Sequence, residues 1–198
     1  MSALDRSPEL MNRDDTALLV VDVQEKLIPS ISGHQTLVWN IRRLLDGAKI
    51  LSVPILGTEQ YPQGLGHTLP ELQSRIDNKL PEKLAFSCGE CGDLFTGLPE
   101  QNVHRILVCG IETHVCVQQT VLDLMAAGFY VYVAVDAVGS RFETDKEIAL
   151  RRMESSGATL TTTEAALVER WVRALATGSH GSCTREEEET SACFCPFF

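Results

Sequence analysis

The chain has 198 residues, of which 44% are hydrophobic and 22% are charged, and its formal net charge is -10. This length suits one domain with a sizeable core, and the composition is that of a folded globular protein. An acidic chain without a stripe of Lys and Arg repels phosphate groups, which excludes nucleic acid from the expected partners.

The N-terminus and the cysteine content are typical of a cytoplasmic protein. The opening "MSALDRSPELMNRDD" is polar, and no stretch has the length and purity of a membrane span. Seven cysteines without a secretory signal are expected to stay free thiols in a reducing compartment. The final "CPFF" formally matches a lipidation motif, but the acidic run before it and its Pro and Phe residues argue against membrane anchoring.

The first elements in the chain are a strand, a helix and a second strand. The continuous apolar run "TALLVVDV" over residues 16–23 is typical of a central strand in a parallel sheet, and it ends at Asp22. Residues 36–52 have helical apolar spacing, and residues 53–59 form the second predicted strand. Residues 60–72 are rich in Gly and Pro and are predicted to be a long loop.

The rest of the chain continues the same alternation. Further strands are predicted over residues 79–87 (weakly), 104–111, 130–138 and 158–162, and helices over residues 91–98, 113–128, 144–157 and 163–176. Thr144 is the expected N-cap of its helix, with Glu147 completing a capping box. Alternating strands and helices predict a three-layer α/β/α fold with a six-stranded parallel sheet. We expect a polar arm over residues 1–15, one domain over residues 16–176, and a disordered or partner-dependent tail over residues 177–198.

Three polar residues follow predicted strands, where parallel sheets bind their ligands. Asp22 ends the first strand, Lys83 lies near the end of the third, and Cys116 follows the strand over residues 104–111. Ligands bind beyond the carboxyl ends of the strands, where the strand order reverses. In the common order 3-2-1-4-5-6, Asp22 and Cys116 face each other across one crevice.

Cys116 is a candidate nucleophile. With Thr113 as N-cap, Cys116 occupies the third helical position, where the helix dipole and a nearby Lys would lower the pKa of its thiol. The alternative is a buried apolar cysteine, which is the interpretation we favour for Cys109 in mid-strand. Alone, Asp22 could cap a helix and Lys83 could be a solvated surface residue.

Taken together, four stretches resemble the isochorismatase-like hydrolases, the family of nicotinamidases and carbamoylsarcosine amidases. They are "LLVVDVQEKL", "KLAFS", "LVCGIETHVCVQQTVLDL" and "VDAVGSR". The resemblance implies that Cys116 is the nucleophile, Asp22 the acid/base and Lys83 the activating residue. It also implies a cis peptide bond before Glu112, and an oxyanion hole formed by the backbone N–H groups of Glu112 and Cys116. The implied reaction is hydrolysis of a small-molecule C–N bond through a thioester on Cys116, without a cofactor.

The sequence departs from the nicotinamidases where these bind a metal. "LGTEQYPQGLGHTLPEL" contains Glu59 and a lone His67 but no Asp-x-His pair, so we expect no active-site metal. This loop is more similar to the subgroup called isochorismatase domain-containing proteins. Gln60 and Tyr61, on a flexible lid, are candidate substrate contacts. Members of the family are commonly oligomers, so we expect a homo-oligomer, with "WVRALA" (residues 171–176) as one apolar face for it.

The CxxC motif and His114 are not expected to take part in the chemistry. Cys88 and Cys91 have CxxC spacing, but Cys193 and Cys195 are poorly spaced as a second ligand pair, so we expect free thiols. His114 is expected to pack or cap locally and to take no part in catalysis. The alternative to a hydrolase is a catalytically silent binding or scaffold protein with the same fold.

Overall fold

The computed structural model describes residues 7–77 and 79–176, with side chains placed up to residue 169. The predicted tail and its "CPFF" motif lie outside the described residues. The strands are β1 (Thr16–Val21), β2 (Ile55–Gln60), β3 (Glu82–Lys83), β4 (Arg105–Ile111), β5 (Tyr130–Gly139) and β6 (Thr159–Thr161). They pair in parallel in the order β3-β2-β1-β4-β5-β6, which confirms the predicted sheet and the position of its reversal between β1 and β4.

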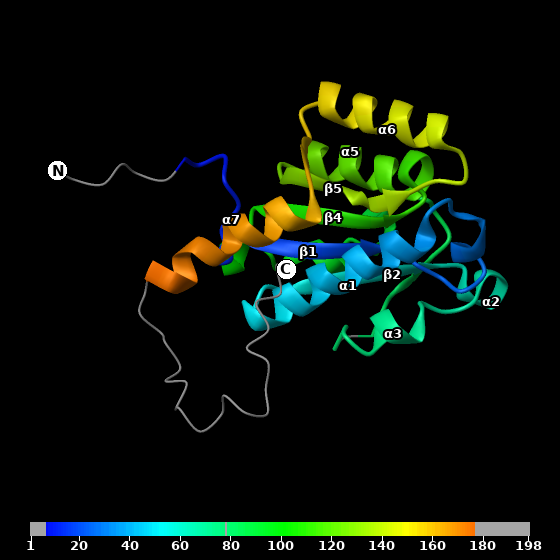
Figure 1. The fold of residues 1–198 in the computed structure, drawn as a ribbon, viewed down its shortest axis with the longest axis horizontal. Coiled ribbons are helices and arrows are strands. Elements are labelled where there is room, and N and C mark those ends of the chain that lie inside the picture. Colours follow the sequence, from blue (N-terminus) through cyan, green and yellow to red (C-terminus); the bar gives the residue numbers. More distant parts are fainter. Residues whose placement is uncertain (1–6, 78, 177–198) are drawn as a thin grey trace.

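Helices cover both faces of the sheet (Figure 1). The α-helices are α1 (His34–Ile50), α2 (Pro62–Leu65), α3 (Pro70–Gln73), α4 (Asp93–Thr96), α5 (Gln118–Ala126), α6 (Glu143–Ser155) and α7 (Thr163–Ala176). Shorter turns are η1 (Ile28–Ser30), η2 (Cys88–Cys91), η3 (Pro99–Gln101) and η4 (Thr113–Val117). Among the described residues, no helix is long and apolar enough to cross a membrane.

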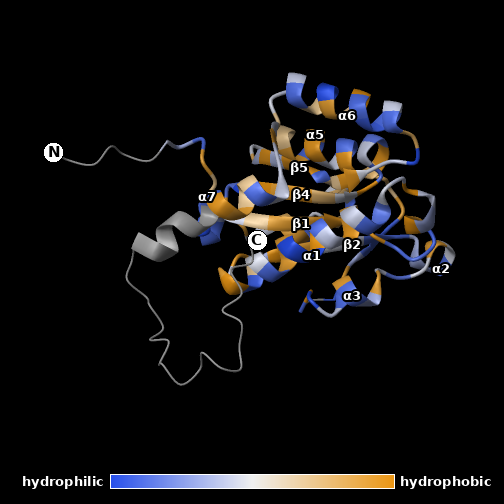
Figure 2. Cartoon of the chain, viewed as in Figure 1, coloured by the Kyte–Doolittle hydropathy of each residue, from blue (hydrophilic) through white to orange (hydrophobic). Residues whose placement is uncertain are grey.

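The central strands separate two apolar clusters, one on each face of the sheet. Leu18 and Val20 of β1 pack with α1, α3 and α7, whereas Leu19 and Val21 pack with α4, α5 and α6. Successive residues of a strand point to opposite faces, so a strand covered on both sides has to be apolar throughout. Figure 2 shows this pattern as apolar strands between helices whose outer surfaces are polar.

Three local predictions were wrong. The loop predicted over residues 60–72 contains α2 and α3, each of which begins at a proline, because proline is well tolerated in the first helical turn. The N-cap of α6 is Phe142 rather than Thr144, and no side chain caps that helix. The helix after β4 begins one residue earlier than expected, with Glu112 as N-cap and a π-helical first turn, η4.

Residues 7–15, part of the predicted polar arm, pack against the sheet. Met11 is fully buried in the cluster beneath α1 and α7. The Tyr132 hydroxyl donates to the carbonyl of Glu9 over 2.7 Å, and the Arg105 guanidinium pairs with Asp15 over 2.5 Å. This segment therefore contributes to the hydrophobic core.

Candidate active site

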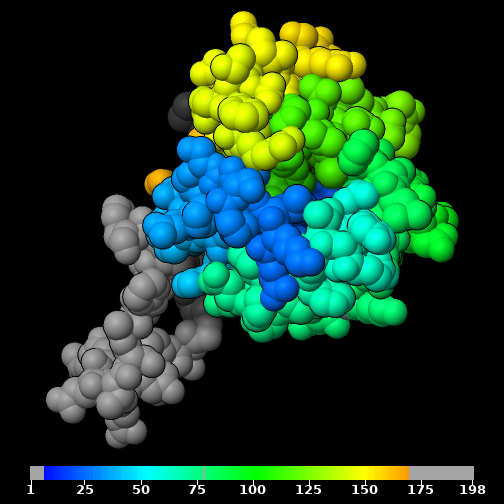
Figure 3. All heavy atoms as spheres, turned by 90° about the vertical axis from the view of Figure 1, so that its right-hand side faces the viewer, coloured from blue at the N-terminus to red at the C-terminus, as the bar shows by residue number. Residues whose placement is uncertain are grey.

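The predicted site residues meet at the carboxyl edge of the sheet, the edge that faces the viewer in Figure 3. Asp22 follows β1, Lys83 ends β3, and Cys116 lies in η4 just after β4. β1 pairs with β4 from Thr16 opposite Arg105 to Val21 opposite Gly110, so the two strands end side by side. The fold therefore brings Asp22 and the turn of Cys116 together.

Asp22 and Lys83 form a buried ion pair. The Lys83 Nζ lies 2.6 Å from Asp22 Oδ2, and both side chains have no exposed surface. Burial alone would lower the pKa of the Lys83 ammonium, but the charge of Asp22, the neighbouring Cys116 and the hydrogen bond to Asp22 together outweigh burial and leave this pKa raised. Asp22 itself has a left-handed backbone conformation, with φ of 50°, which turns the chain sharply out of β1.

The ammonium of Lys83 is enclosed by further acceptors. Gln60 Oε1 accepts from Nζ over 2.8 Å, and the carbonyls of Phe86 and Ala85 accept over 2.9 and 3.3 Å. The other end of the Gln60 amide donates to the carbonyl of Leu84 over 2.8 Å. Both ends of this side chain bind protein groups, and one of them holds Lys83 in place. The expected contact of Gln60 with substrate stays a prediction.

Cys116 is almost buried, with 6% of its surface exposed. Burial, and then the negative charge of Asp22, raise the pKa of its thiol, while Lys83 lowers that pKa only in part. The expectation of a lowered pKa was wrong, because burial of the thiol and the charge of Asp22 together outweigh the effect of Lys83. At neutral pH the resting site therefore contains a protonated thiol next to a carboxylate that can accept its proton.

A second thiol and a hydroxyl lie behind Asp22. The Thr58 hydroxyl donates to Asp22 Oδ1 over 2.8 Å and lies 3.3 Å from the sulfur of Cys88. Burial, followed by the charge of Asp22, raises the pKa of Cys88 to about 11. We did not predict either residue as part of this site. The signal for Thr58 is that it carries the single hydroxyl of β2, directly after the apolar start of that strand.

The turn before Cys116 is attached to the segment after β5. The peptide bond between Ile111 and Glu112 is cis. The carboxylate of Glu112 accepts from the backbone N–H and the Nε–H of Arg141, both over 3.1 Å. His114 Nδ1 lies 3.0 Å from the Ser140 hydroxyl. His114 Nε2 lies 3.8 Å from Asp145, so this ring joins η4 to the segment after β5 and to α6. Its packing role stays a prediction.

Glu59 and His67 form a pair at the start of the predicted lid. The Glu59 carboxylate accepts from the backbone N–H of Thr68 over 2.6 Å and lies 3.0 Å from His67 Nδ1. His67 is exposed and Glu59 is buried, so the pair ties the loop after α2 to the end of β2. Across residues 7–77 and 79–176, no three His, Cys, Asp or Glu side chains lie close enough together to bind a metal ion.

Tyr61 and the cysteines were also singled out from the sequence. Tyr61, the second candidate substrate contact, is half exposed and has φ of 38°. Cys88, Cys91, Cys109 and Cys116, the cysteines of the described region, are all free thiols. Cys88 is buried and Cys91 is partly exposed, so the two ends of the CxxC motif lie in different environments.

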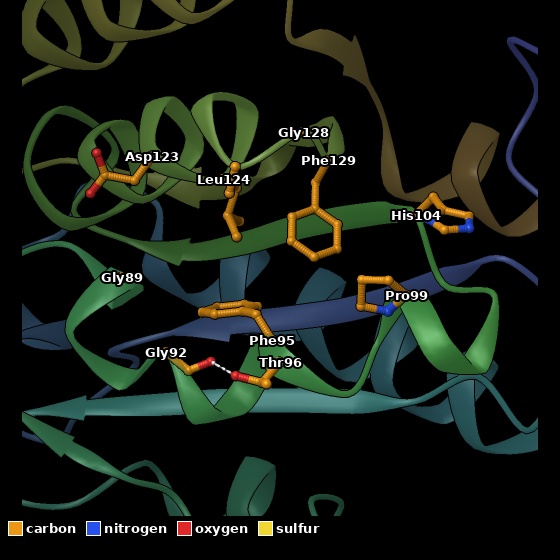
Figure 4. A pocket seen from close by; sticks show the side chains of 11 residues that line it. Gly89, Gly92, Phe95, Thr96, Pro99, His104, Asp123, Leu124, Gly128 and Phe129 are labelled. Atoms are coloured by element: carbon orange, nitrogen blue, oxygen red, sulfur yellow. Dashed lines mark hydrogen bonds between the residues drawn. The ribbon is translucent and has the colours of Figure 1, made fainter.

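A groove of about 450 Å³ runs between α4 and α5, on the face of the sheet that these helices cover. Phe95, Phe129 and Leu124 line its apolar part, and Asp123 lies at one end (Figure 4). None of Asp22, Lys83 and Cys116 lines it. We place the candidate chemistry at the sheet edge, because the thiol of Cys116, the carboxyl group of Asp22 and the ammonium of Lys83 converge there.

Comparisons with known proteins give the same family. Residues 16–165 match the model of the isochorismatase domain family. Isochorismatase domain-containing protein 2 of Xenopus laevis is 40% identical over 171 residues, covering 85% of this chain and 82% of the relative. The mouse protein 2A is 38% identical over 161 residues, covering 79% of this chain and 75% of its own.

Two solved structures extend the comparison. The MAR1 ribonuclease of Caenorhabditis elegans has a TM-score of 0.74 and 41% identity, covering 81% of this chain and 83% of that protein. The Escherichia coli YcaC gene product, described as an octameric hydrolase of unknown specificity, has a TM-score of 0.78 and 24% identity, covering 87% and 88%, and shows the fold alone. The chain belongs to the isochorismatase domain family, and its relatives at 38–40% identity are isochorismatase domain-containing proteins.

Proposed function

We propose that this protein is a cysteine hydrolase that cleaves the C–N bond of a small-molecule amide through a thioester on Cys116. The observation that carries the proposal is the fully buried pair of Lys83 and Asp22, 2.6 Å apart, next to the protonated thiol of Cys116. A paired carboxylate beside a nucleophile is the arrangement that general acid–base catalysis requires.

In the first half of the reaction, Cys116 forms the new bond. Asp22 takes the thiol proton while the sulfur attacks the amide carbon, and the carbonyl oxygen becomes an oxyanion. The backbone N–H groups of Glu112 and Cys116 are the proposed donors to this oxyanion. When the C–N bond breaks, Asp22 returns the proton to the departing amine, and the acyl group stays on Cys116 as a thioester.

In the second half, water releases the acyl group. Asp22 takes a proton from the water as its oxygen attacks the thioester, the C–S bond breaks, and Cys116 regains its proton as a carboxylic acid leaves. Lys83 keeps the charge of Asp22 balanced in the site and fixes its orientation. No cofactor enters these steps.

The test combines turnover with trapping of the intermediate. The full chain is incubated with a panel of primary amides and ureides, released ammonia is measured, and intact mass reports acyl-Cys116. We expect turnover that Cys116→Ala abolishes and that Asp22→Asn lowers by more than about 100-fold. If none of the amides and ureides is turned over and iodoacetamide alkylates Cys116 equally fast in wild type and Asp22→Asn, the protein is a silent scaffold and the proposal fails.

Cleavage of RNA is the second candidate, because the C. elegans relative at 41% identity is called a ribonuclease. Against it stands the net charge of -10, which disfavours binding of a polyphosphate. Incubation with single-stranded RNA separates the two. Cleavage that survives removal of trace nucleases and is lost in Cys116→Ala would favour the ribonuclease, and intact RNA favours the amide hydrolase.

Self-association belongs to the same proposal, in line with the octameric E. coli hydrolase of the same fold. The exposed apolar side chains Leu84 and Phe86, which flank the candidate site, support it. The side chains of the predicted "WVRALA" face lie outside the described part of the chain. Light scattering coupled to size-exclusion chromatography should give a mass that is a multiple of 21.8 kDa.

A further inference from the structure

We propose that Thr58 is a positioning residue of this site, whose hydroxyl orients the Asp22 carboxylate for proton transfer while the buried Cys88 thiol sets the direction of that hydroxyl. The inference rests on the proposed function, in which Asp22 accepts and returns a proton. It adds a residue pair, Thr58 and Cys88, that acts through Asp22 and does not touch the substrate.

Backbone pairing fixes Thr58 beside Asp22. Thr58 lies opposite Val21 in the register of β1 and β2, and its carbonyl accepts from the backbone N–H of Asp22 over 3.3 Å. Thr58 is 1% exposed, and Asp22 and Cys88 have no exposed surface. The three polar groups are therefore shielded from bulk water and depend on one another for hydrogen bonds.

The direction of the hydrogen bonds follows from the number of protons available. A carboxylate only accepts, so the single hydroxyl proton of Thr58 is directed at Asp22 Oδ1, 2.8 Å away. The lone pairs of the hydroxyl then face the sulfur of Cys88 at 3.3 Å, and the S–H of Cys88 donates to them. With its pKa raised to about 11, Cys88 keeps its proton at neutral pH and remains a donor.

The same hydroxyl can serve the protonated form of Asp22. Lys83 Nζ, which only donates, lies 2.6 Å from Oδ2, so the proton taken from Cys116 is better placed on Oδ1. The Thr58 hydroxyl then rotates, accepts from the new O–H, and donates to the sulfur of Cys88. The S–H bond of Cys116 breaks and one O–H bond forms on Asp22. Elsewhere only the direction of hydrogen bonds changes.

The experiment compares Thr58→Val, which removes the hydroxyl at nearly constant volume, with Thr58→Ser, which keeps it. The probe is iodoacetamide, whose carbon forms a bond to the Cys116 sulfur as iodide leaves and the thiol proton passes to Asp22. Rate constants for Cys116 in the full chain are measured by peptide mapping from about pH 4.5 to about pH 9.5. Circular dichroism melts confirm that each variant is folded.

We expect the acid limb of the pH–rate profile to move up by about one pH unit in Thr58→Val, because the carboxylate loses one donor. At the wild-type midpoint of that limb this lowers the rate about fivefold, and well below the midpoint about tenfold. Thr58→Ser should stay within about twofold of wild type, because the donor is retained. Cys88→Ala should move the acid limb upward by less than Thr58→Val does. Cys88→Ser should return the limb to its wild-type position.

Asp22→Asn separates failure of this inference from failure of the hydrolase. If Asp22→Asn loses the acid limb but Thr58→Val retains the wild-type profile, Thr58 is only a packing residue and the inference is overturned. If Asp22→Asn itself has the wild-type profile, Asp22 is not the base and both proposals fail. A shift shared equally by Thr58→Val and Thr58→Ser would also overturn it, because the hydroxyl would then not be the cause.

Discussion

The charges of Asp22 and Lys83 are stable in the interior because each side chain has several fixed partners. Asp22 accepts from Lys83 and Thr58, and Lys83 also donates to Gln60 and to the carbonyl of Phe86. A buried charge that loses its partner is strongly destabilising, whereas removal of both charges costs much less. The pair is therefore a stability determinant as well as the proposed proton-transfer machinery.

Lys83→Met tests this coupling. It leaves the Asp22 carboxylate buried without its cation, and we expect the free energy of unfolding to fall by about 3–5 kcal/mol in urea titrations. The double variant Asp22→Asn/Lys83→Met should recover part of this loss, because neither charge remains. Strictly additive losses would mean that the two side chains do not depend on each other.

The same variant affects the thiol. Lys83 lowers the pKa of Cys116, against burial and Asp22, which raise it. Removal of Lys83 therefore reduces the thiolate fraction further, and alkylation of Cys116 should slow at every pH where the variant is folded. The sequence analysis also expected Lys83 to lower the pKa of Cys116. The pKa of Cys116 in the wild-type protein is nevertheless raised rather than lowered.

Site residues could be predicted from the sequence where their role follows from their position on a strand. Asp22 and Cys116 were found because strand ends converge at one edge of a parallel sheet. The roles of Thr58 and Gln60 depend on which atoms their side chains meet, and no periodic pattern encodes that. Lys83 was placed by the same rule, but its two-residue strand has little signal of its own, and the family resemblance gave it a role.

At the scale of elements, the site depends on the close approach of β1 and β4. Gly110, the last residue but one of β4, has φ of 120°, and a Cβ atom there would lie 2.1 Å from the carbonyl oxygen of Val21, the residue before Asp22. Only glycine combines that backbone conformation with that contact. The geometry that brings Asp22 beside η4 therefore requires Gly110.

Gly110→Ala should consequently lower the free energy of unfolding by more than about 3 kcal/mol, from backbone strain and the clash together. Gly128→Ala is the matched control. Gly128 also has a positive φ, of 94°, but its added Cβ would meet nothing within 4 Å, so we expect a loss of only about 1 kcal/mol. Equal effects in thermal or urea unfolding would mean that the contact with Val21 is relieved without cost.

The stability with which the loop after α2 is attached to β2 is expected to depend on pH, because Glu59 and His67 form that attachment. The hydrogen bond to Glu59 raises the pKa of His67 above its ordinary value of 6.5. The stabilisation of the loop by protonated His67 is therefore fully present below pH 6.5 and is lost as pH rises through the raised pKa. Burial opposes ionisation of Glu59, but the Thr68 N–H and His67 outweigh it and lower its pKa below 4.5. The stabilisation of the loop by ionised Glu59 is fully present above pH 4.5 and is lost as pH falls through the lowered pKa.

Both contributions are therefore present between pH 4.5 and pH 6.5. Hydrogen exchange of the backbone amides over residues 66–69, corrected for intrinsic rates, should show the greatest protection in this window. His67→Gln should remove the decline of protection above it and leave the decline below it. An unchanged profile in His67→Gln would mean that the loop is attached by Glu59 and Thr68 alone.

At the scale of the whole molecule, the order of elements was predictable and their ends were not. Continuous apolar strands and helical periodicity are averaged over many residues, so the parallel sheet followed from the sequence. The start of α6 and the π-helical turn η4 depend on a few local contacts and were missed. The packing of residues 7–15 was missed because one buried Met lies in an otherwise polar segment.

Met11 gives a test of that segment. Met11→Ala removes a fully buried side chain from the cluster under α1 and α7, and we expect a loss of about 2–4 kcal/mol in urea unfolding. Leu10→Ala is the neighbouring control, because Leu10 is 38% exposed and its truncation should change stability by only about 0.5 kcal/mol. If both variants match wild type, residues 7–15 are dispensable for the core.

The edge position of β3 has a consequence for how the candidate site is assembled. β3 pairs with β2 through only two residue pairs, Glu59 with Glu82 and Gln60 with Lys83, so its backbone ladder is too short to stabilise it alone. The side chain of Lys83 adds to this ladder through its ion pair with Asp22. We therefore expect docking of β3 and pairing of the two charges to occur together during folding. A chain in which these groups have not paired would lack both its edge strand and the proposed catalytic site.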